Sequence, residues 1–314
     1  MNMVLAGILN DLAKTELSLD HHSKEAEYYD LQSLEIKQRV SGTGATKEDL
    51  FETIHELGFV SFDLGRYKDA HHYFVKALHI RRQLDGGPNA VNKCLAEILH
   101  YLGYVDSKLN RYAKSRSYYL EAIQMYRRIF GENTKDRFFL SALDDIAVLE
   151  MRHGNFEESR LHFLKILKLK GGIVDAQDAT QQQQELAGTL NHLGYLEKKL
   201  GRYEKSRFYY LGALECHQQT TPHRSSSSSS SSNTGVVINK SLASIMHNVG
   251  HINYLLGRYD EAKSYLEKSL QMQRYINGPG GTHIQLALTL RCLGSLEFDL
   301  DRYQQSRLYY QEAL

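Results

Sequence analysis

The side chains best suited to chemistry in this chain are its histidines and cysteines. There are 15 histidines and three cysteines, Cys94, Cys216 and Cys292. The adjacent pairs His21–His22 and His71–His72 invite a metal site, but neighbours on a helix point about 100° apart. No Cys-x-x-Cys or His-Glu-x-x-His spacing accompanies them. We therefore expect no metal site and no cofactor, and we interpret the histidines as solvated or as lining a binding surface.

Motifs for nucleophilic or phosphate chemistry are also absent from the sequence. There is no Gly-x-Ser-x-Gly, no phosphate loop ending in Gly-Lys-Ser/Thr, and no Gly-x-Gly-x-x-Gly before a strand. The acidic residues are plentiful, but helical proteins usually carry such residues on solvent faces. We predict that this segment is not an enzyme.

The composition indicates which kinds of partner and which cellular location to expect. The 314 residues carry a formal net charge of +1, so no bulk field favours nucleic acid or an anionic membrane. The sparse, odd cysteine count is typical of a reducing compartment. The apolar start from Met1 to Leu9 is too short for a signal peptide, and no stretch approaches a membrane span. We expect a cytoplasmic protein that neither binds nucleic acid nor inserts into a membrane.

The elements that position these residues are set by an internal repeat. A Leu-Gly-Arg-Tyr phrase occurs at residues 64–67, 200–203 and 256–259, and variants of it fill the gaps. Each copy follows a second landmark, an apolar residue and then a small one, which recurs every 44 to 47 residues except for one interval of 56. The small residue of that landmark is Gly58, Gly103, Ala147, Gly194, Gly250 or Gly294. A fixed period of this size predicts stacked units.

Each unit is predicted to be a pair of helices. From Leu50 to Leu64 the apolar residues are spaced three or four apart, which predicts one helix with one buried stripe. Gly65 is a natural helix end. A second helical pattern starts at Lys68, with small residues at Ala70 and Ala77 and an aromatic ring between them, and it recurs in the other copies.

These residues resemble the tetratricopeptide repeat, of the tandem kind found in kinesin light chain and nephrocystin. The resemblance covers about residues 46–314 and implies an all-α fold, a right-handed superhelical solenoid of stacked antiparallel helix pairs. It has six clear units and a degenerate N-terminal one. The chain departs from the family pattern three residues after the first small residue, where the usual aromatic is replaced by Ser61, Asp106, Glu150, Glu197, Asn253 or Glu297.

The predicted organisation has four parts. Residues 1–45 form a degenerate helical unit or cap, 46–216 hold units one to four, and 242–314 hold units five and six, the last one cropped. Residues 217–241 are expected to be a flexible insert, because Ser225–Ser232 is an unbroken serine tract that buries nothing.

Recurrence in register also decides how the tyrosines and arginines are interpreted. Tyrosines recur at the turn, for example Tyr203 and Tyr303, and on the second helix, which favours core packing over nucleic-acid stacking. Arginines recur on the second helix, and salt bridging on the outer face is favoured over a phosphate-binding ladder. These arginines are Arg116, Arg160, Arg207 and Arg307.

In the resembled family the concave face is built by first-helix positions that avoid the core. Exposed rings there offer apolar anchors, and polar side chains can bond an extended peptide. We predict a protein-protein interaction scaffold or adaptor that binds a peptide or protein on this face. The alternatives are a regulatory array of a larger enzyme, an architectural cytoskeletal or ciliary component, and a spacer with no ligand. The predicted partner-binding residues are Phe59, Phe62, His100, Tyr101, Tyr104, Asn191, Tyr195, Lys198, His247, Asn248, His251, Tyr254, Arg291 and Phe298.

Overall fold

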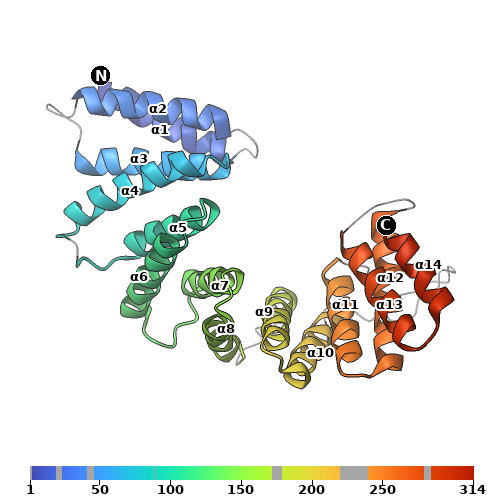
Figure 1. Cartoon of the computed structure of the whole chain (residues 1–314). Helices are drawn as coiled ribbons and strands as arrows, with labels where there is room; N and C mark the ends of the chain where they lie inside the picture. Colours follow the sequence, from blue (N-terminus) through green and yellow to red (C-terminus); the bar gives the residue numbers. More distant parts are fainter. Residues whose placement is uncertain are drawn as a thin grey trace, which may run out of the picture. The chain divides into compact units, whose positions relative to one another are not determined.

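The computed structural model describes residues 2–18, 23–40, 46–87, 89–171, 179–219, 240–278 and 284–314. Within these residues every regular element is an α-helix, which confirms the predicted all-α class (Figure 1). The first helices in chain order are α1 (Asn2–Ser18), α2 (Ser23–Val40), α3 (Lys47–Asp63), α4 (Tyr67–Leu84), α5 (Lys93–Lys108), α6 (Tyr112–Phe130) and α7 (Arg137–Arg152). They are followed by α8 (Phe156–Lys170), α9 (Ala179–Lys199), α10 (Tyr203–Gln219), α11 (Lys240–Leu255), α12 (Tyr259–Asn277), α13 (Ile284–Asp299) and α14 (Tyr303–Ala313).

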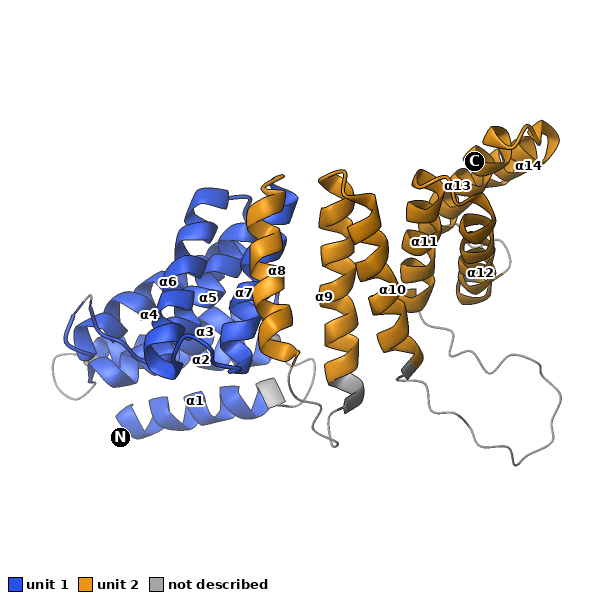
Figure 2. Cartoon of the chain, turned by 90° about the horizontal axis from the view of Figure 1, so that it is seen from below, with its two compact units in different colours: residues 1–153 blue, residues 154–314 orange. Residues whose placement is uncertain are grey.

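The helices fall into two compact units, which Figure 2 colours separately. Unit 1 is Met1–His153 and unit 2 is Gly154–Leu314. Within unit 1 each helix from α1 to α7 packs on the next, and within unit 2 the same holds from α8 to α14. Further contacts join α5 to α7 and α11 to α13, the first helices of successive pairs. This nearest-neighbour packing is that of a repeat protein.

The Leu-Gly-Arg-Tyr phrase forms the turn between the two helices of a pair, as between α3 and α4. Gly65 has a φ of +70°, a left-handed conformation that glycine adopts without steric cost. Its N–H donates to the Phe62 carbonyl at 2.9 Å, and the Arg66 N–H donates to the Ser61 carbonyl at 2.8 Å. These two bonds satisfy the last carbonyls of α3 in a Schellman motif. Asn110 and Asp301, the two non-glycine substitutes, have a positive φ at the same place.

The small residue of the other landmark lies at the crossing of the two helices. A Cβ added to Gly194 would lie 2.6 Å from the ring of Tyr210, which is fully buried. Gly58 meets Phe74 and Gly103 meets Tyr119 at the same distance. The predicted register is therefore confirmed, because at these three crossings the ring of the second helix occupies the space that a Cβ on the first would need.

The sequence pattern predicted that the recurring tyrosines pack in the core, but only some of them do. Tyr119 and Tyr210, which lie against glycines, are buried. The turn tyrosines Tyr203 and Tyr303 are 37% and 55% exposed. Tyr67, Tyr112 and Tyr259, at the same position, are half-buried, so the turn tyrosines flank the core and do not fill it.

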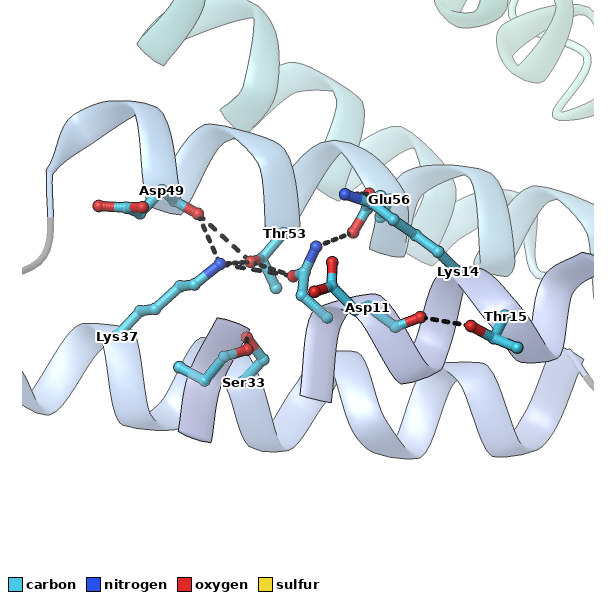
Figure 3. A network of polar contacts seen from close by, with 10 residues as sticks. Asp11, Lys14, Thr15, Ser33, Lys37, Asp49, Thr53 and Glu56 are labelled. Atoms are coloured by element: carbon cyan, nitrogen blue, oxygen red, sulfur yellow. Dashed lines mark hydrogen bonds and ion pairs between the residues drawn. The ribbon is translucent and has the colours of Figure 1, made fainter. Parts of the chain in front are cut away.

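Helices α1 and α2 form a pair with the same internal architecture. The Ser33 hydroxyl donates to the Ala6 carbonyl at 2.8 Å, as Ser269 does to Ala243 in unit 2. Four residues after Ala26, however, the apolar side chain found in the other pairs, usually a ring, is replaced by Asp30, which is fully buried. This region also holds a polar network between α1, α2 and α3 (Figure 3), in which the buried Lys37 ammonium donates to Thr53 at 2.6 Å.

Asp30 should make the stability of unit 1 depend on pH. Burial, and then the nearby Glu56 charge, raise the pKa of Asp30 to about 8, although Lys37 and Lys14 oppose the shift. The folded state therefore binds a proton that the unfolded state releases, so this group's contribution falls as pH rises from about 4 to about 8. We expect Asp30→Asn to stabilise unit 1 by about 1–3 kcal/mol at pH 8 and much less at pH 4. Urea unfolding at both pH values is the test, and an equal effect at both would show that Asp30 stays ionised.

Two further sequence predictions concern membrane insertion and the serine tract. None of the described helices has the length and apolar character needed to cross a membrane. The serine tract Ser225–Ser232 lies outside the described residues, between the end of α10 and the start of α11.

Candidate partner-binding surfaces

Successive repeats are joined by a recurring pair of a base and a buried acid. Arg116 Nε on α6 donates to the Glu150 carboxylate on α7 at 2.7 Å, and Arg160 Nε on α8 donates to Glu197 on α9 at 2.5 Å. Lys263 Nζ lies 2.6 Å from Glu297. These acids are fully buried, so the positions where the chain departs from its family pattern belong to the core.

Salt bridging by the recurring arginines is confirmed for Arg116, Arg160 and Arg207, but the acids bound by Arg116 and Arg160 are buried in the core and do not lie on the outer face. For Arg207 the first-helix partner is an amide. Its Nε donates to Asn253 Oδ1 at 2.7 Å, and its Nη2 donates to Glu261 at 2.8 Å. In some repeats the buried acid is also approached by the arginine of its own turn. Arg202, for example, lies 3.6 Å from Glu197. Arg307 is exposed.

In unit 1 four predicted residues come together as a cluster of rings on α3 and α5. We call Phe59, Phe62, Tyr101 and Tyr104 the α3–α5 ring cluster. The Phe59 and Tyr101 centroids are 4.7 Å apart, and Phe62 lies 5.5 Å from Tyr101 and 5.3 Å from Tyr104, all edge to face. This arrangement is favourable for aromatic quadrupoles. Each ring remains partly exposed.

The ring cluster packs on a buried ring of α4 and has polar groups beside it. Phe74 on α4, which is fully buried, lies 5.3 Å from Phe59 and stacks on Tyr101. The Lys108 ammonium lies 5.0 Å from the Tyr104 ring. His100, also predicted here, bonds Asp145 on α7 at 2.7 Å, so its ring is held between two first helices rather than being free to receive a ligand.

In unit 2 the predicted residues form a polar row on α9 and α11. The Asn248 amide donates to Asn191 Oδ1 at 2.9 Å, and Lys198 Nζ lies 3.5 Å from His251 Nδ1. Both cations of the pair Lys198 and Lys199 approach the Tyr195 ring, at 5.8 and 5.5 Å. Burial lowers the pKa of Lys198. This surface is therefore rich in donors and amides, unlike the ring cluster of unit 1.

The remaining predicted residues lie on α11 and α13. Tyr254 donates to Asp299 at 2.7 Å, and this bond, together with burial, raises the pKa of Tyr254 to about 12. Arg291 is exposed, and Phe298 is 56% exposed beside Tyr303. His247 is the exception to the predicted exposure, because it is buried and bonds Thr289.

Sequence motifs did not reveal two features of these surfaces. The first is the buried support that Phe74 gives to the ring cluster. The second is a group of potential metal ligands, in which His247, His251 and Cys292 bring ligand atoms within 4.8 Å of one another. The spacing of four residues between the two histidines was the one sequence signal for this group. The cysteine could not be linked to them, because it lies on another helix, 41 residues after His251.

The helix pairs, their Schellman turns and their nearest-neighbour packing define a tandem helical-repeat protein. Comparison with family models gives the same class: tetratricopeptide repeat models match residues 49–128, 187–215 and 241–314. The chain belongs to the tetratricopeptide repeat family. No curated protein sequence matches it.

Several solved structures share this fold at low sequence identity. BtubC from P. vanneervenii is 16% identical with a TM-score of 0.58, and the match covers 84% of this chain and 96% of BtubC. The apo form of the quorum sensor NprR from B. thuringiensis is 16% identical with a TM-score of 0.53, covering 99% and 96%. A putative kinesin light chain from Podosopora anserina is 11% identical with a TM-score of 0.54, covering 77% and 99%.

Proposed function

We propose that this chain is a non-enzymatic scaffold or adaptor that binds a peptide or protein partner on the concave face formed by its first helices. The observation that carries the proposal is the α3–α5 ring cluster, whose rings stay partly exposed although each is held by its neighbours. Aromatic anchors dominate the energetics of protein interfaces. Rings that are already fixed lose little conformational entropy on binding, which increases the affinity that they provide.

The polar row of unit 2 would serve the same partner class by different chemistry. The paired amides of Asn191 and Asn248 can bond the backbone of an extended peptide. Lys199 and Arg291 add positive charge, which favours acidic side chains or a terminal carboxylate. We place this activity in the cytoplasm, in keeping with the sparse cysteine content.

Replacing a ring of each surface should weaken binding without unfolding the chain. We expect Tyr104→Ala and Tyr195→Ala each to weaken a bound peptide by about 1 kcal/mol or more, roughly fivefold in Kd. The probe is a peptide selected from a random phage-displayed library against the whole chain, with its Kd measured by isothermal titration calorimetry.

Exposed tyrosines elsewhere on each unit provide matched controls. Tyr28 on α2 and Tyr275 on α12 are 59% and 74% exposed, and their alanine variants should leave Kd unchanged. Arg116 and Arg207 are unsuitable controls, because each bonds the following repeat. Selected peptides whose affinity ignores both Tyr104 and Tyr195 but follows a control tyrosine would place the binding surface elsewhere. A library that yields no peptide would contradict the proposed function itself.

A further inference from the structure

In unit 2, His247 and His251, which were predicted to line the partner-binding face, lie close to Cys292, a grouping that partner binding does not require. We propose that His247 and His251 on α11, together with Cys292 on α13, form a binding site for a thiophilic d10 metal ion, Cu⁺ or Zn²⁺. Their ligand atoms all lie within 4.8 Å of one another. The site does not depend on the proposed scaffold function.

The backbone already places the three ligands around one point. His247 and His251 are four residues apart on α11, so their rings lie on one face of the helix. Helix α13, which carries Cys292, packs directly against α11. Nitrogen and sulfur ligands bind zinc at about 2.0–2.3 Å, which puts two ligands of one ion roughly 3.5 Å apart. The ligand atoms, which lie within 4.8 Å of one another, must approach by about 1 Å to share an ion.

The hydrogen bonds of His247 prepare one ring nitrogen for a metal. The Thr289 hydroxyl lies 2.9 Å from the Gln285 carbonyl, which can only accept, and 3.0 Å from His247 Nδ1. When the hydroxyl donates to that carbonyl, it accepts from Nδ1–H, and the lone pair of Nε2 is then available to a metal. Metal-binding histidines characteristically donate their other N–H to such a partner, which fixes the tautomer and the orientation of the ring.

The chemistry of the donor set also suits a metal. An ion that enters the site displaces the thiol proton of Cys292 and gains one thiolate and two imidazole ligands. Thiolate ligands select soft ions such as Cu⁺ and Zn²⁺ over Mg²⁺ or Ca²⁺.

Neighbouring cations set the charge that the site prefers. Lys198 Nζ lies 3.5 Å from His251 Nδ1, and Arg291 precedes Cys292 on α13. A Cu⁺ ion bound to one thiolate is electrically neutral, whereas Zn²⁺ bound to the same ligands keeps one positive charge near these cations. We therefore expect Cu⁺ to be favoured. We also expect Lys198→Met to tighten binding of Zn²⁺ more than binding of Cu⁺, because it removes a repelling charge.

Metal titration of the purified, tag-free whole chain tests the site. Co²⁺ serves as a spectroscopic probe of thiolate ligation, and competition with chromophoric chelators gives the Kd for Cu⁺ and for Zn²⁺. We expect one equivalent of Co²⁺ to give a thiolate-to-cobalt charge-transfer band. Thr289→Val should weaken binding by about 10–100-fold, the usual effect of losing such an outer partner. Cys292→Ser and His251→Asn should weaken it further.

Two substitutions in the same unit are the matched controls, Cys216→Ser and His192→Asn. Both should keep the charge-transfer band and the affinity. Bound metal should also raise the melting temperature of the wild-type chain and of these controls but not of Cys292→Ser. If Cys292→Ser fails to fold, as judged by circular dichroism, the loss of metal binding by His251→Asn is the test, and the reverse also holds. The absence of a cobalt–thiolate band in the wild-type chain would overturn the proposal, and so would a band that survives Cys292→Ser or disappears with Cys216→Ser.

Discussion

Arg160→Ala should lower the free energy of unfolding of unit 2 by about 3–5 kcal/mol. Arg160 Nε donates to Glu197 at 2.5 Å, and the Glu197 side chain is fully buried. Arg202 approaches the second carboxylate oxygen only to 3.6 Å, so it cannot take over the lost bond without moving. Removing Arg160 therefore leaves a buried negative charge with poor compensation. Urea unfolding followed by far-ultraviolet circular dichroism measures the loss.

The chain itself provides the control for the role of charge in this pair. In the next repeat the acid is replaced by Asn253, which accepts a bond from Arg207 at 2.7 Å. A neutral amide is thus compatible with this position. In a Glu197→Gln background, Arg160→Ala should cost far less than in the wild-type chain, because no charge is left buried.

A more exposed ion pair in the same unit shows how little stability is lost when the acid is not buried. Arg258 and Glu204 lie 3.0 Å apart with side chains that are 38% and 65% exposed, and Arg258→Ala should cost no more than about 1 kcal/mol. An equal loss for Arg160→Ala in the wild-type and Glu197→Gln backgrounds would mean that Arg160 acts through packing of its aliphatic stem and not through its charge.

The fold was predictable from the sequence because its determinants are local and repeated. Gly65 and its equivalents mark the turn, where a positive φ excludes most other residues. Gly194 and its equivalents mark the helix crossing, where the ring of Tyr210 leaves no room for a Cβ. Each feature depends on residues within one helix pair, so its signal lies within about 20 residues of sequence.

The buried acids were harder to place, because their partners lie in another repeat. Glu150 and Glu197 break the apolar pattern of the first helix, which by itself suggests an exposed position. Their burial is possible because Arg116 and Arg160, 34 and 37 residues earlier, provide the compensating charge. The joint recurrence of a base on one helix and an acid on the next was the only sequence signal for this pairing.

The candidate sites show the same limit. Helical spacing placed Phe59 and Tyr101 on the proposed binding face, but it could not show that their rings touch across two helices. It also gave no indication that Cys292 lies near His247, since no short motif joins residues 45 positions apart. Contacts between repeats depend on the stacking of helices, and a pattern within one helix does not specify that stacking.

Leu193→Ala should destabilise unit 2 by about 2–5 kcal/mol, the usual cost of truncating a buried leucine. Leu193 is fully buried and lies immediately before Gly194 at the helix crossing. Its helix, α9, packs on both α8 and α10, so a cavity there weakens two interfaces at once. In a repeat protein each interface also supports its neighbours, and we expect the whole unit to melt at a lower denaturant concentration.

The matched control is Leu161→Ala on α8, where the same atoms are removed from a side chain that is 61% exposed. This variant should change the stability by no more than about 0.5 kcal/mol. Chemical denaturation of the two variants and the wild-type chain, with the slope m compared as well as the midpoint, separates lost packing from a change in the unfolded state. Equal stability of Leu193→Ala and Leu161→Ala would contradict the register that places each Leu-Gly landmark at a helix crossing. Truncating a fully buried leucine leaves a cavity, whereas truncating an exposed one does not.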